Sequence, residues 1–484
     1  MCLSLSRNHP QQCKCLVSDV FSVKNLPTDN IIEAPNRILP TQHLSLYPSL
    51  FVSQTFLAAS LPVLYRKPIL NTPQAFELLE KQISKRPGLG TLIRELDLTK
   101  LTLTLDDNWT RGVGPKALLS LLQKTPLLQD IRIGSQHGGA RLHSDTWNCI
   151  FSKISYVRTV SINDSDSRVQ LQDFHLTDMS QSSGWMENLT ITKSFALPQT
   201  TIRNILSSQP RLRSLDFSGS LIAGDWLSAL SSSTRLQHLD LSKCLGGVDE
   251  DGNNPTVDFL SSHPAASTLQ SLNLSSMTDL PSLSLTNRDM ARILCKIPAS
   301  TMQRLDLRGT PLLREQLPLL QRFTNLEELH VSHDFFVSDL ETLMLSGGYT
   351  FPTQQTNLSP AQELLQVDPG KMVNISDMGS LARNVLICKL MQRVNRVFPN
   401  KPCSTDKSQL SRSKLRYLDL SDISRTQILK ILDSVLLAEE SKPLEVIELG
   451  PSALDWCDVG VKQLFRSAGW RPRCVGKRSW IERI

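Results

Sequence analysis

The sequence lacks the features that mark a membrane-spanning chain or an enzyme of a common class. It has no uninterrupted apolar run of the roughly 18 residues that a spanning helix needs. It has no glycine-rich phosphate-binding loop, no HExxH zinc motif and no GxSxG nucleophile motif. Arg7, Asn8 and His9 interrupt the apolar character of the N-terminal stretch, so we expect no secretory signal. These absences argue against a membrane partner and against catalysis by this chain.

The ten cysteines are scattered without regular spacing. In a chain that carries no secretory signal, such cysteines are most simply reduced thiols. Cys13 and Cys15 form a C-x-C pair, but no nearby Cys or His completes the four ligands that tetrahedral zinc needs. We therefore expect no metal site and no cofactor.

A short apolar phrase recurs along most of the chain. Its form is apolar-x-x-apolar-x-apolar, and it occurs at least eleven times, as in LRSLDF (212–217), LQHLDL (236–241) and MQRLDL (302–307). The middle apolar residues lie 24 to 35 residues apart, except for one gap of 89 residues between Leu329 and Leu418. Alternation at the end of each phrase predicts a short strand, and helix-like stretches such as 225–234 and 312–323 lie between phrases.

This pattern resembles the leucine-rich repeat of the ribonuclease-inhibitor-like subtype. One phrase carries Cys244 at the position where the family often has Asn or Cys, and others carry Ser220 or Thr310 there. The resemblance implies an α/β fold, a right-handed solenoid with parallel strands on its concave face and helices on its convex face. Each strand-plus-helix unit would bury its apolar face by stacking on the next unit.

The long gap between two phrases has two interpretations. Segments 347–362 and 400–413 are polar and rich in turn residues, and 377–398 has the apolar spacing of a helix that Asp377 could cap. We favour an insertion that contains one helix. The alternative is a pair of repeats whose sequences have drifted beyond recognition.

The segment ahead of the repeats, residues 26–66, resembles an F-box. It has a Leu-Pro start, an amphipathic stretch, a second Leu-Pro-like turn, an apolar stretch and then Leu-Tyr-Arg just before the repeats, an order typical of fungal-type F-box proteins. The resemblance implies docking on the linker subunit of an SCF-type ubiquitin ligase and hence on its cullin scaffold. The residues that would bind the linker subunit are Leu26, Pro27, Ile31, Ile32, Leu39, Pro40, Leu44, Leu50, Val52 and Phe56. The alternative is a helical cap that only shields the first repeat.

The two positions that flank the middle apolar residue of each phrase should point away from the core and line the concave face. Across the eleven phrases these positions hold nine acids and two bases. The predicted substrate-binding residues are Asp97, Asp216, Asp240, Asp306, His330 and Asp419. One interpretation is an acidic groove that prefers a basic segment of a target protein. The other is a hydrated polar face with no partner.

The formal net charge of +6 is concentrated near the C-terminus. Residues 461–484 contain seven Lys or Arg and one acid, with Trp470 and Trp480 among them. Because the rest of the chain is formally balanced, we do not expect a nucleic-acid-binding body. Three interpretations of the tail stay open: a cap on the last repeat, a site for nucleic acid or acidic lipid, and docking into the chain's own acidic groove.

The sequence thus predicts five segments. They are an N-terminal tail (1–22), an F-box-like helical module (23–70), leucine-rich repeats (71–345), a polar insertion with one helix (346–413), and final repeats with a basic cap (414–484). The predicted function is a non-catalytic substrate receptor of an SCF-type ubiquitin ligase, in the cytoplasm or nucleus. The alternative is a repeat scaffold or a regulator of small GTPases, with Arg308 as a candidate active arginine.

Overall fold

The computed structural model of the chain divides into two compact units. The first comprises Met1–Leu285 and Lys296–Pro298, and the second comprises Thr286–Cys295 and Ala299–Ile484. The structure describes residues 53–101, 103, 113–135, 144–164, 185–193, 199–222, 226–246, 254–276, 283–313, 316–331, 340, 414–421, 431, 434–437, 444–450 and 459–484.

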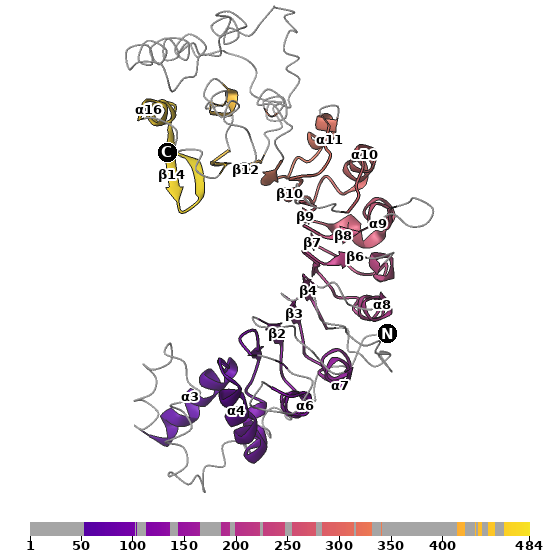
Figure 1. The fold of residues 1–484 in the computed structure, drawn as a ribbon, viewed down its shortest axis with the longest axis vertical. Helices are drawn as coiled ribbons and strands as arrows, with labels where there is room; N and C mark the ends of the chain where they lie inside the picture. The colour runs from indigo at the N-terminus through magenta and orange to yellow at the C-terminus, as the bar shows by residue number, and fades with distance from the viewer. Residues whose placement is uncertain are drawn as a thin grey trace, which may run out of the picture. The chain divides into compact units, whose positions relative to one another are not determined.

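The first unit carries a sheet of short parallel strands stacked in chain order (Figure 1). Its strands are β1 (Glu95–Asp97), β2 (Asp130–Ser135), β3 (Thr159–Asp164), β4 (Asn188–Thr192), β5 (Ser214–Asp216), β7 (His238–Asp240) and β9 (Ser271–Asn273). A second, two-stranded sheet pairs β6 (Leu221–Ile222) with β8 (Leu245–Gly246). Each strand of the larger sheet comes from one of the recurring phrases.

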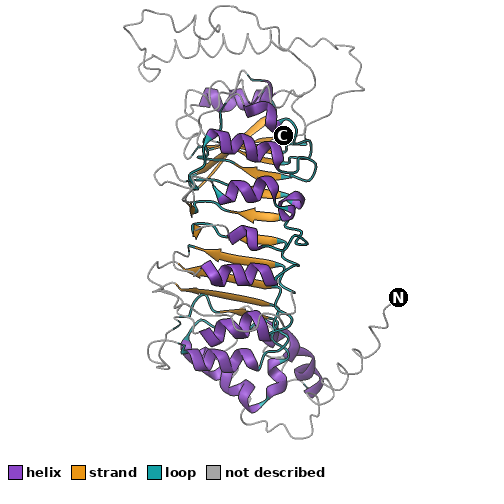
Figure 2. Cartoon of the chain, turned by 90° about the vertical axis from the view of Figure 1, so that its right-hand side faces the viewer, coloured by secondary structure: helices purple, strands orange, loops and turns teal. Residues whose placement is uncertain are grey.

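Helices cover one face of this sheet, as Figures 1 and 2 show. They are α4 (Pro73–Lys85), α5 (Pro87–Gly90), α6 (Pro115–Gln123), α7 (Ser144–Asn148), the π-helical turn Cys149–Lys153, α8 (Gln199–Ser208), the 3-10 turn Trp226–Ala229, α9 (Pro255–Ser262) and the 3-10 turn Pro264–Thr268. A further helix, α3 (Gln54–Arg66), lies beyond α4 at the end of the stack. The local sequence determines where several of these helices begin. The Thr72 side chain accepts the Ala75 N–H, and proline follows the cap, where its missing N–H costs nothing.

The second unit begins with four parallel strands and ends in a hairpin. The parallel strands are β10 (Arg304–Asp306), β11 (Glu328–His330), β12 (Tyr417–Leu420) and β13 (Val446–Leu449). β15 (Arg478–Arg483) pairs antiparallel with β13, and β14 (Trp470–Val475) pairs antiparallel with β15 at the edge. The helical elements are α10 (Asn287–Lys296), α11 (Leu317–Leu320), the 3-10 turn Val435–Leu437 and α16 (Val459–Ser467).

The middle apolar residue of every phrase is buried in the core. All eleven are 1% exposed or less: Leu96, Ile131, Val160, Leu189, Leu215, Leu239, Leu272, Leu305, Leu329, Leu418 and Ile447. Each unit therefore buries its strands against its helical layer. The predicted mixed α/β fold with mostly parallel, unclosed sheets is confirmed.

Two predicted helices are shorter than expected. Within 225–234 the described helical residues are only the 3-10 turn Trp226–Ala229, and within 312–323 they are Leu317–Leu320 together with a single turn at Gln316. The first stretch ends in serines, and Ser231 Oγ accepts the Ser233 N–H in place of a helical carbonyl. In the second, the proline of LPLL fits only the first turn of a helix.

The 89-residue gap lies between two strands that are direct neighbours. β11 pairs in parallel with β12, with Leu329 opposite Leu418 and His330 opposite Asp419. The intervening residues therefore place no strand between these two. The predicted insertion 346–413 and its predicted helix 377–398 lie outside the described residues, as do residues 1–52.

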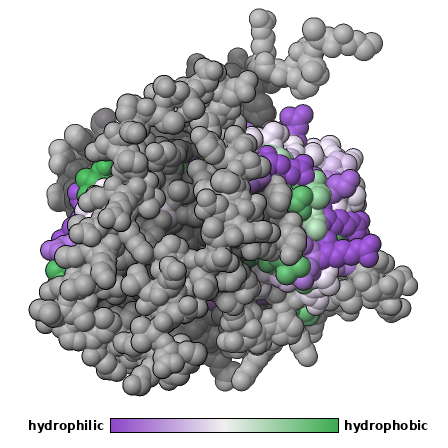
Figure 3. Space-filling model, turned by 90° about the horizontal axis from the view of Figure 1, so that it is seen from above, coloured by the Kyte–Doolittle hydropathy of each residue, from purple (hydrophilic) through white to green (hydrophobic). Residues whose placement is uncertain are grey.

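The described residues that are visible in Figure 3 show hydrophilic areas in purple beside pale areas and hydrophobic areas in green. None of the helices in the described ranges has the length and apolar character needed to cross a membrane. Two aromatic side chains of the first unit, Tyr156 and Trp185, are 43% and 42% exposed.

Candidate protein-interaction face

Each sheet has a face that helices do not cover, which we call the open face. The strand register confirms the two predicted columns on it. In the first unit one column runs Asp97, Arg132, Ser161, Thr190, Asp216, Asp240, Asn273. In the second unit it runs Asp306, His330, Asp419, Glu448 and Trp480. The structure thus brings Asp216 next to Asp240 and places His330 between Asp306 and Asp419, whereas the strands β2, β3 and β4 separate Asp97 from Asp216.

The aspartates of these columns shape the turn that follows each strand. In six phrases the side-chain oxygen of the Asp or Asn accepts the backbone N–H two residues later. The pairs are Asp97 with Thr99 (3.1 Å), Asp216 with Ser218 (2.9 Å), Asp240 with Ser242 (2.8 Å), Asn273 with Ser275 (3.0 Å), Asp306 with Arg308 (3.1 Å) and Asp419 with Ser421 (2.8 Å). Such side-chain turns explain the recurring Leu-Asp-Leu wording. They also give these residues a structural role beyond the binding role that the sequence predicts.

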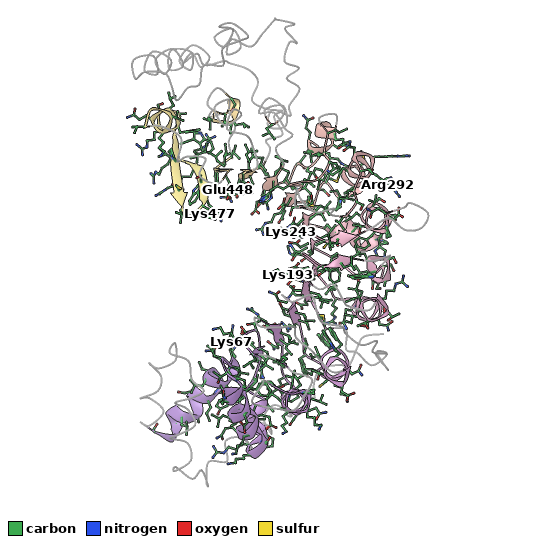
Figure 4. All side chains as sticks on the ribbon, viewed as in Figure 1. Lys67, Lys193, Lys243, Arg292, Glu448 and Lys477 are labelled. Carbon is green, nitrogen blue, oxygen red and sulfur yellow. The ribbon has the colours of Figure 1, made fainter. Side chains whose placement is uncertain are left out.

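The chain turns sharply just after these bonds. Gly219 has φ +69° and the equivalent Gly309 has φ +66°, the left-handed region where glycine has no steric penalty. Lys193 and Lys243 occupy the equivalent positions with φ 57° and 55°. Figure 4 shows both lysines on the side of the strands away from the helices.

Asp216 and Asp240 form the acidic part of the first unit's open face. Asn273 Nδ2 donates to Asp240 Oδ2 at 2.9 Å. Burial raises the pKa of Asp216, and the neighbouring charge of Asp240 adds to the rise. Among the described residues neither carboxylate forms an ion pair with Lys or Arg. The described residues therefore leave the charge of this neighbouring pair without an ion-pair partner.

The acids of the second unit's open face are instead neutralised by arginine. Arg308 Nη2 lies 2.6 Å from Asp306 Oδ2, and Arg308 Nη1 lies 3.0 Å from Asp419 Oδ2. His330 Nδ1 lies 2.9 Å from the same Asp419 oxygen. The side chains of Asp306 and Asp419 are only 11% and 3% exposed. A basic segment of a target would find these two carboxylates already occupied.

The same network continues across the next two strands. The Tyr417 hydroxyl donates a hydrogen bond to Glu448. Arg478 donates two more to the same carboxylate, from Nε (2.7 Å) and Nη2 (2.5 Å). The hydrogen bond from Arg478 lowers the pKa of Glu448. Burial and the hydrogen bond to Glu448 raise the pKa of Tyr417. Burial alone would raise the pKa of Asp419, but the bond to His330, the Ser421 N–H and the charge of Arg308 outweigh it, so this pKa lies below its usual value.

Sequence reasoning identifies the members of this network but not their association. Arg308 is a candidate from the sequence for an arginine presented to a GTPase, yet its guanidinium is held by two carboxylates. Presenting it to a nucleotide would require these bonds to break. One signal is available in the sequence, because LDLRGT places Arg308 where LDFSGS and LDLSKC have serine.

The end of the predicted F-box-like module packs on the first strand. The Arg94 N–H donates to the Arg66 carbonyl at 2.9 Å, and Ile69 forms a parallel bridge with Asp97. Leu64 and Leu70 are buried, 6% and 2% exposed. Residues 64–70 therefore cover the edge of β1. Of the ten predicted linker-binding residues, nine lie outside the described residues, and Phe56 lies in α3, where the backbone alone is described.

The basic tail covers the last parallel strand of the second unit. Trp470 is fully buried and donates its indole N–H to the Leu437 carbonyl at 3.0 Å, and Arg483 lies 4.7 Å above its ring. Through Arg478 and Glu448 the tail also reaches one acid of the open face. The hairpin thus combines features of two of the interpretations of the tail, a cap and a segment docked on the chain's own acids. It packs on the last parallel strand, and it binds Glu448 of the acidic column.

No group of three His, Cys, Asp or Glu side chains that could hold a metal ion occurs among the described residues.

No family model matches the chain, and no curated protein matches it. A solved crystal structure of the complex of Rad7 and Elc1 in yeast is similar to it, at 14% sequence identity and a TM-score of 0.33. The match covers 69% of this chain and 86% of that one. A sequence identity and a TM-score this low do not establish a shared fold or function.

Proposed function

We propose that the chain is a leucine-rich-repeat substrate receptor of an SCF-type ubiquitin ligase, with an F-box at residues 23–70. The F-box would dock on the linker subunit, and the repeats would hold a target protein for ubiquitination. The chain itself would contribute positioning and no nucleophile. Its place of action would be the cytoplasm or the nucleus.

The register of the repeats carries this proposal. Eleven phrases with weakly similar sequences give parallel strands in which every middle apolar residue is buried and the flanking residues stand in register with those of the neighbouring strands. Repeats that stack in this way present a long surface without closing on themselves, which suits the capture of another protein. The described part of the segment that resembles an F-box contains α3, and α4 and α5 follow it before the first of these strands.

The linker docking can be tested with point variants of the full chain. Ile31→Asp/Ile32→Asp would place two charges on the predicted linker-binding surface. We expect loss of co-purification with the linker subunit and cullin, while the midpoint of thermal unfolding stays unchanged. A truncation at Asn71 is a poorer test, because it also removes Ile69 and Leu70, which cover the edge of β1.

A matched control is Val63→Asp in α3. Val63 is 53% exposed and is not among the predicted linker-binding residues. We expect this variant to retain the linker subunit. Retention by the Ile31/Ile32 variant as well as by the control would refute the F-box.

The second candidate is a repeat scaffold whose N-terminal segment is only a cap. The covering of β1 by residues 64–70 favours this alternative. It predicts that the full-length chain never retains the linker subunit. It also predicts that substitutions of Leu64 and Leu70 lower stability without removing a partner.

A further inference from the structure

A row of aromatic and arginine residues lies at the N-terminal ends of β3, β4, β5 and β7 in the first unit's sheet. Tyr156, Trp185, Arg211 and Arg235 each stand three residues before the strand residues Thr159, Asn188, Ser214 and His238. Those four strand residues are successive register partners. The four side chains therefore project from equivalent places on neighbouring strands, which lie about 4.8 Å apart.

A second row runs beside the first, one residue before the same strand positions. It consists of Arg158, Glu187, Arg213 and Gln237. The backbone there is fixed by a ladder in which the N–H of each member donates to the carbonyl of the member before it, at 2.8, 2.8 and 2.7 Å. The side chains are thus mounted on a rigid base, so a ligand need not order the backbone when it binds.

We call Tyr156, Arg158, Trp185, Arg211, Arg213 and Arg235 the arginine edge. All six are exposed. Tyr156 and Trp185 are the only aromatic residues among the exposed large hydrophobic residues of the described ranges. Trp, Tyr and Arg are the residue types that dominate binding energy at protein interfaces.

The four arginines of the edge have no carboxylate partner among the described residues. Arg211 lies 4.0 Å above the Trp185 ring, which holds both side chains in place and leaves guanidinium N–H groups available. Five arginines of the second unit are, by contrast, paired with acids: Arg304 with Glu328, Arg308 with Asp306, Arg416 with Glu445, Arg473 with Glu482 and Arg478 with Glu448. Glu187 is the one acid in the two rows of the edge.

From this contrast we infer that the arginine edge binds an acidic segment of a partner protein, rich in Asp and Glu. Four arginines with unused donors match carboxylates, which accept two hydrogen bonds from one guanidinium. The row spans three strand spacings, roughly 14 Å, the length of about four residues of extended peptide. Trp185 and Tyr156 would pack against the apolar parts of the same segment.

The charges around the edge favour a short acidic peptide over a nucleic acid. A phosphate backbone carries charge along its whole length and needs an extended cationic track. Here the same strands carry Asp216 and Asp240 on the adjoining open face, and Glu187 lies within the edge. A longer polyanion would run onto these carboxylates.

The test is direct binding of a fluorescently labelled peptide that contains a run of Glu, measured by anisotropy with the purified full chain. We expect saturable binding that weakens with added salt, and no binding of the same peptide with Gln in place of Glu. Arg213→Glu should weaken the affinity about tenfold, because the edge then repels the peptide. Arg235→Glu serves the same purpose if Arg213→Glu does not fold.

The matched control is Arg466→Glu, which makes the same change of charge at an exposed arginine of α16 in the second unit. It should leave the affinity unchanged. An equal loss in Arg466→Glu, or no binding of the Glu peptide, would overturn the inference. So would tighter binding of a single-stranded oligonucleotide that Arg213→Glu abolishes, since the edge would then be a nucleic-acid site. The assay contains no linker subunit, so its outcome is independent of the proposed ligase role.

Discussion

Arg308 and Asp419 are 111 residues apart in the sequence, yet Arg308 Nη1 donates a hydrogen bond to Asp419 Oδ2 at 3.0 Å. Arg308 follows β10 and Asp419 lies in β12, so the contact spans β11. The contact also joins residues on either side of the 89-residue gap in the repeat pattern, because Arg308 precedes the gap and Asp419 follows it. His330, on the strand between them, binds the same carboxylate oxygen. The second unit thus holds three strands together with one shared charge cluster.

Removal of the Arg308 side chain should destabilise the second unit. Arg308→Ala leaves the buried Asp419 carboxylate with His330 and a backbone N–H but without its arginine, which we expect to lower the free energy of unfolding by about 2 kcal/mol. Urea denaturation measures the change. Arg416→Ala is the control, because it removes an equally bidentate arginine from Glu445 at the exposed surface and should cause no measurable loss. Equal effects of the two substitutions would contradict the importance of burial.

The same cluster predicts a loss of stability in acid. The pKa of Asp419 is lower in the folded chain than its usual value, so its contribution is fully present above the unfolded pKa of about 4. It is lost as the pH falls through the folded pKa. Asp419→Asn removes this titration and should show a smaller decline between neutral pH and pH of about 3. Identical declines for the variant and the parent chain would exclude Asp419 as a source of acid sensitivity.

The aspartates of the acidic groove carry charge and also form side-chain turns, and Asn or Ala substitutions can test these two roles separately. Asp216→Asn keeps the oxygen that accepts the N–H two residues later, as Asn273 already does in its own phrase. Asp240→Asn keeps that oxygen too, but it replaces the acceptor of the Asn273 amide with an NH2 group and should cost about 1 kcal/mol. We expect Asp216→Asn to unfold like the parent chain and both variants to bind a basic target segment more weakly. Asp216→Ala removes the acceptor and should cost about 1 kcal/mol. Unchanged capture by the Asn variants would leave the open face as a hydrated polar surface.

The C-terminal hairpin should be required for a stable second unit. Trp470→Ala empties a fully buried site and is expected to cost about 3 to 5 kcal/mol. Trp470→Phe keeps most of the volume but leaves the Leu437 carbonyl without its donor, and should cost roughly 1 to 2 kcal/mol. Calorimetry ranks the two. A tail that serves only as a ligand-binding arm would tolerate both substitutions.

The strands and their register could be predicted because they depend on a local pattern. One buried residue in the middle of each phrase fixes which neighbours face outward, and the stack of parallel strands repeats that choice. The helices were harder to predict, since tertiary packing decides how far each one extends. In 225–234 the serines form their own turn, and in 312–323 the proline of LPLL leaves only one helical turn after it.

The chemistry of the open face was less visible in the sequence. A count of acids predicts a negative groove, but the count does not show which carboxylates bind backbone amides and which lie beside arginine. Arg478 comes from the tail and neutralises Glu448 from a strand 30 residues earlier. The basic composition of the tail predicts a cap but not its two strands, although the Gly476-Lys477 turn, with Gly476 at φ +60°, is a hairpin signal.

β14 has a consequence for how the molecule behaves in a crowded solution. A stack of open parallel strands could in principle continue from one molecule into the next, and so polymerise. Here the sheet ends in an antiparallel hairpin, whose outer strand carries Pro472 without an N–H and has Arg471 and Arg473 exposed along it. Incoming strands therefore meet a missing donor and charged side chains, both of which oppose further strand pairing at this edge.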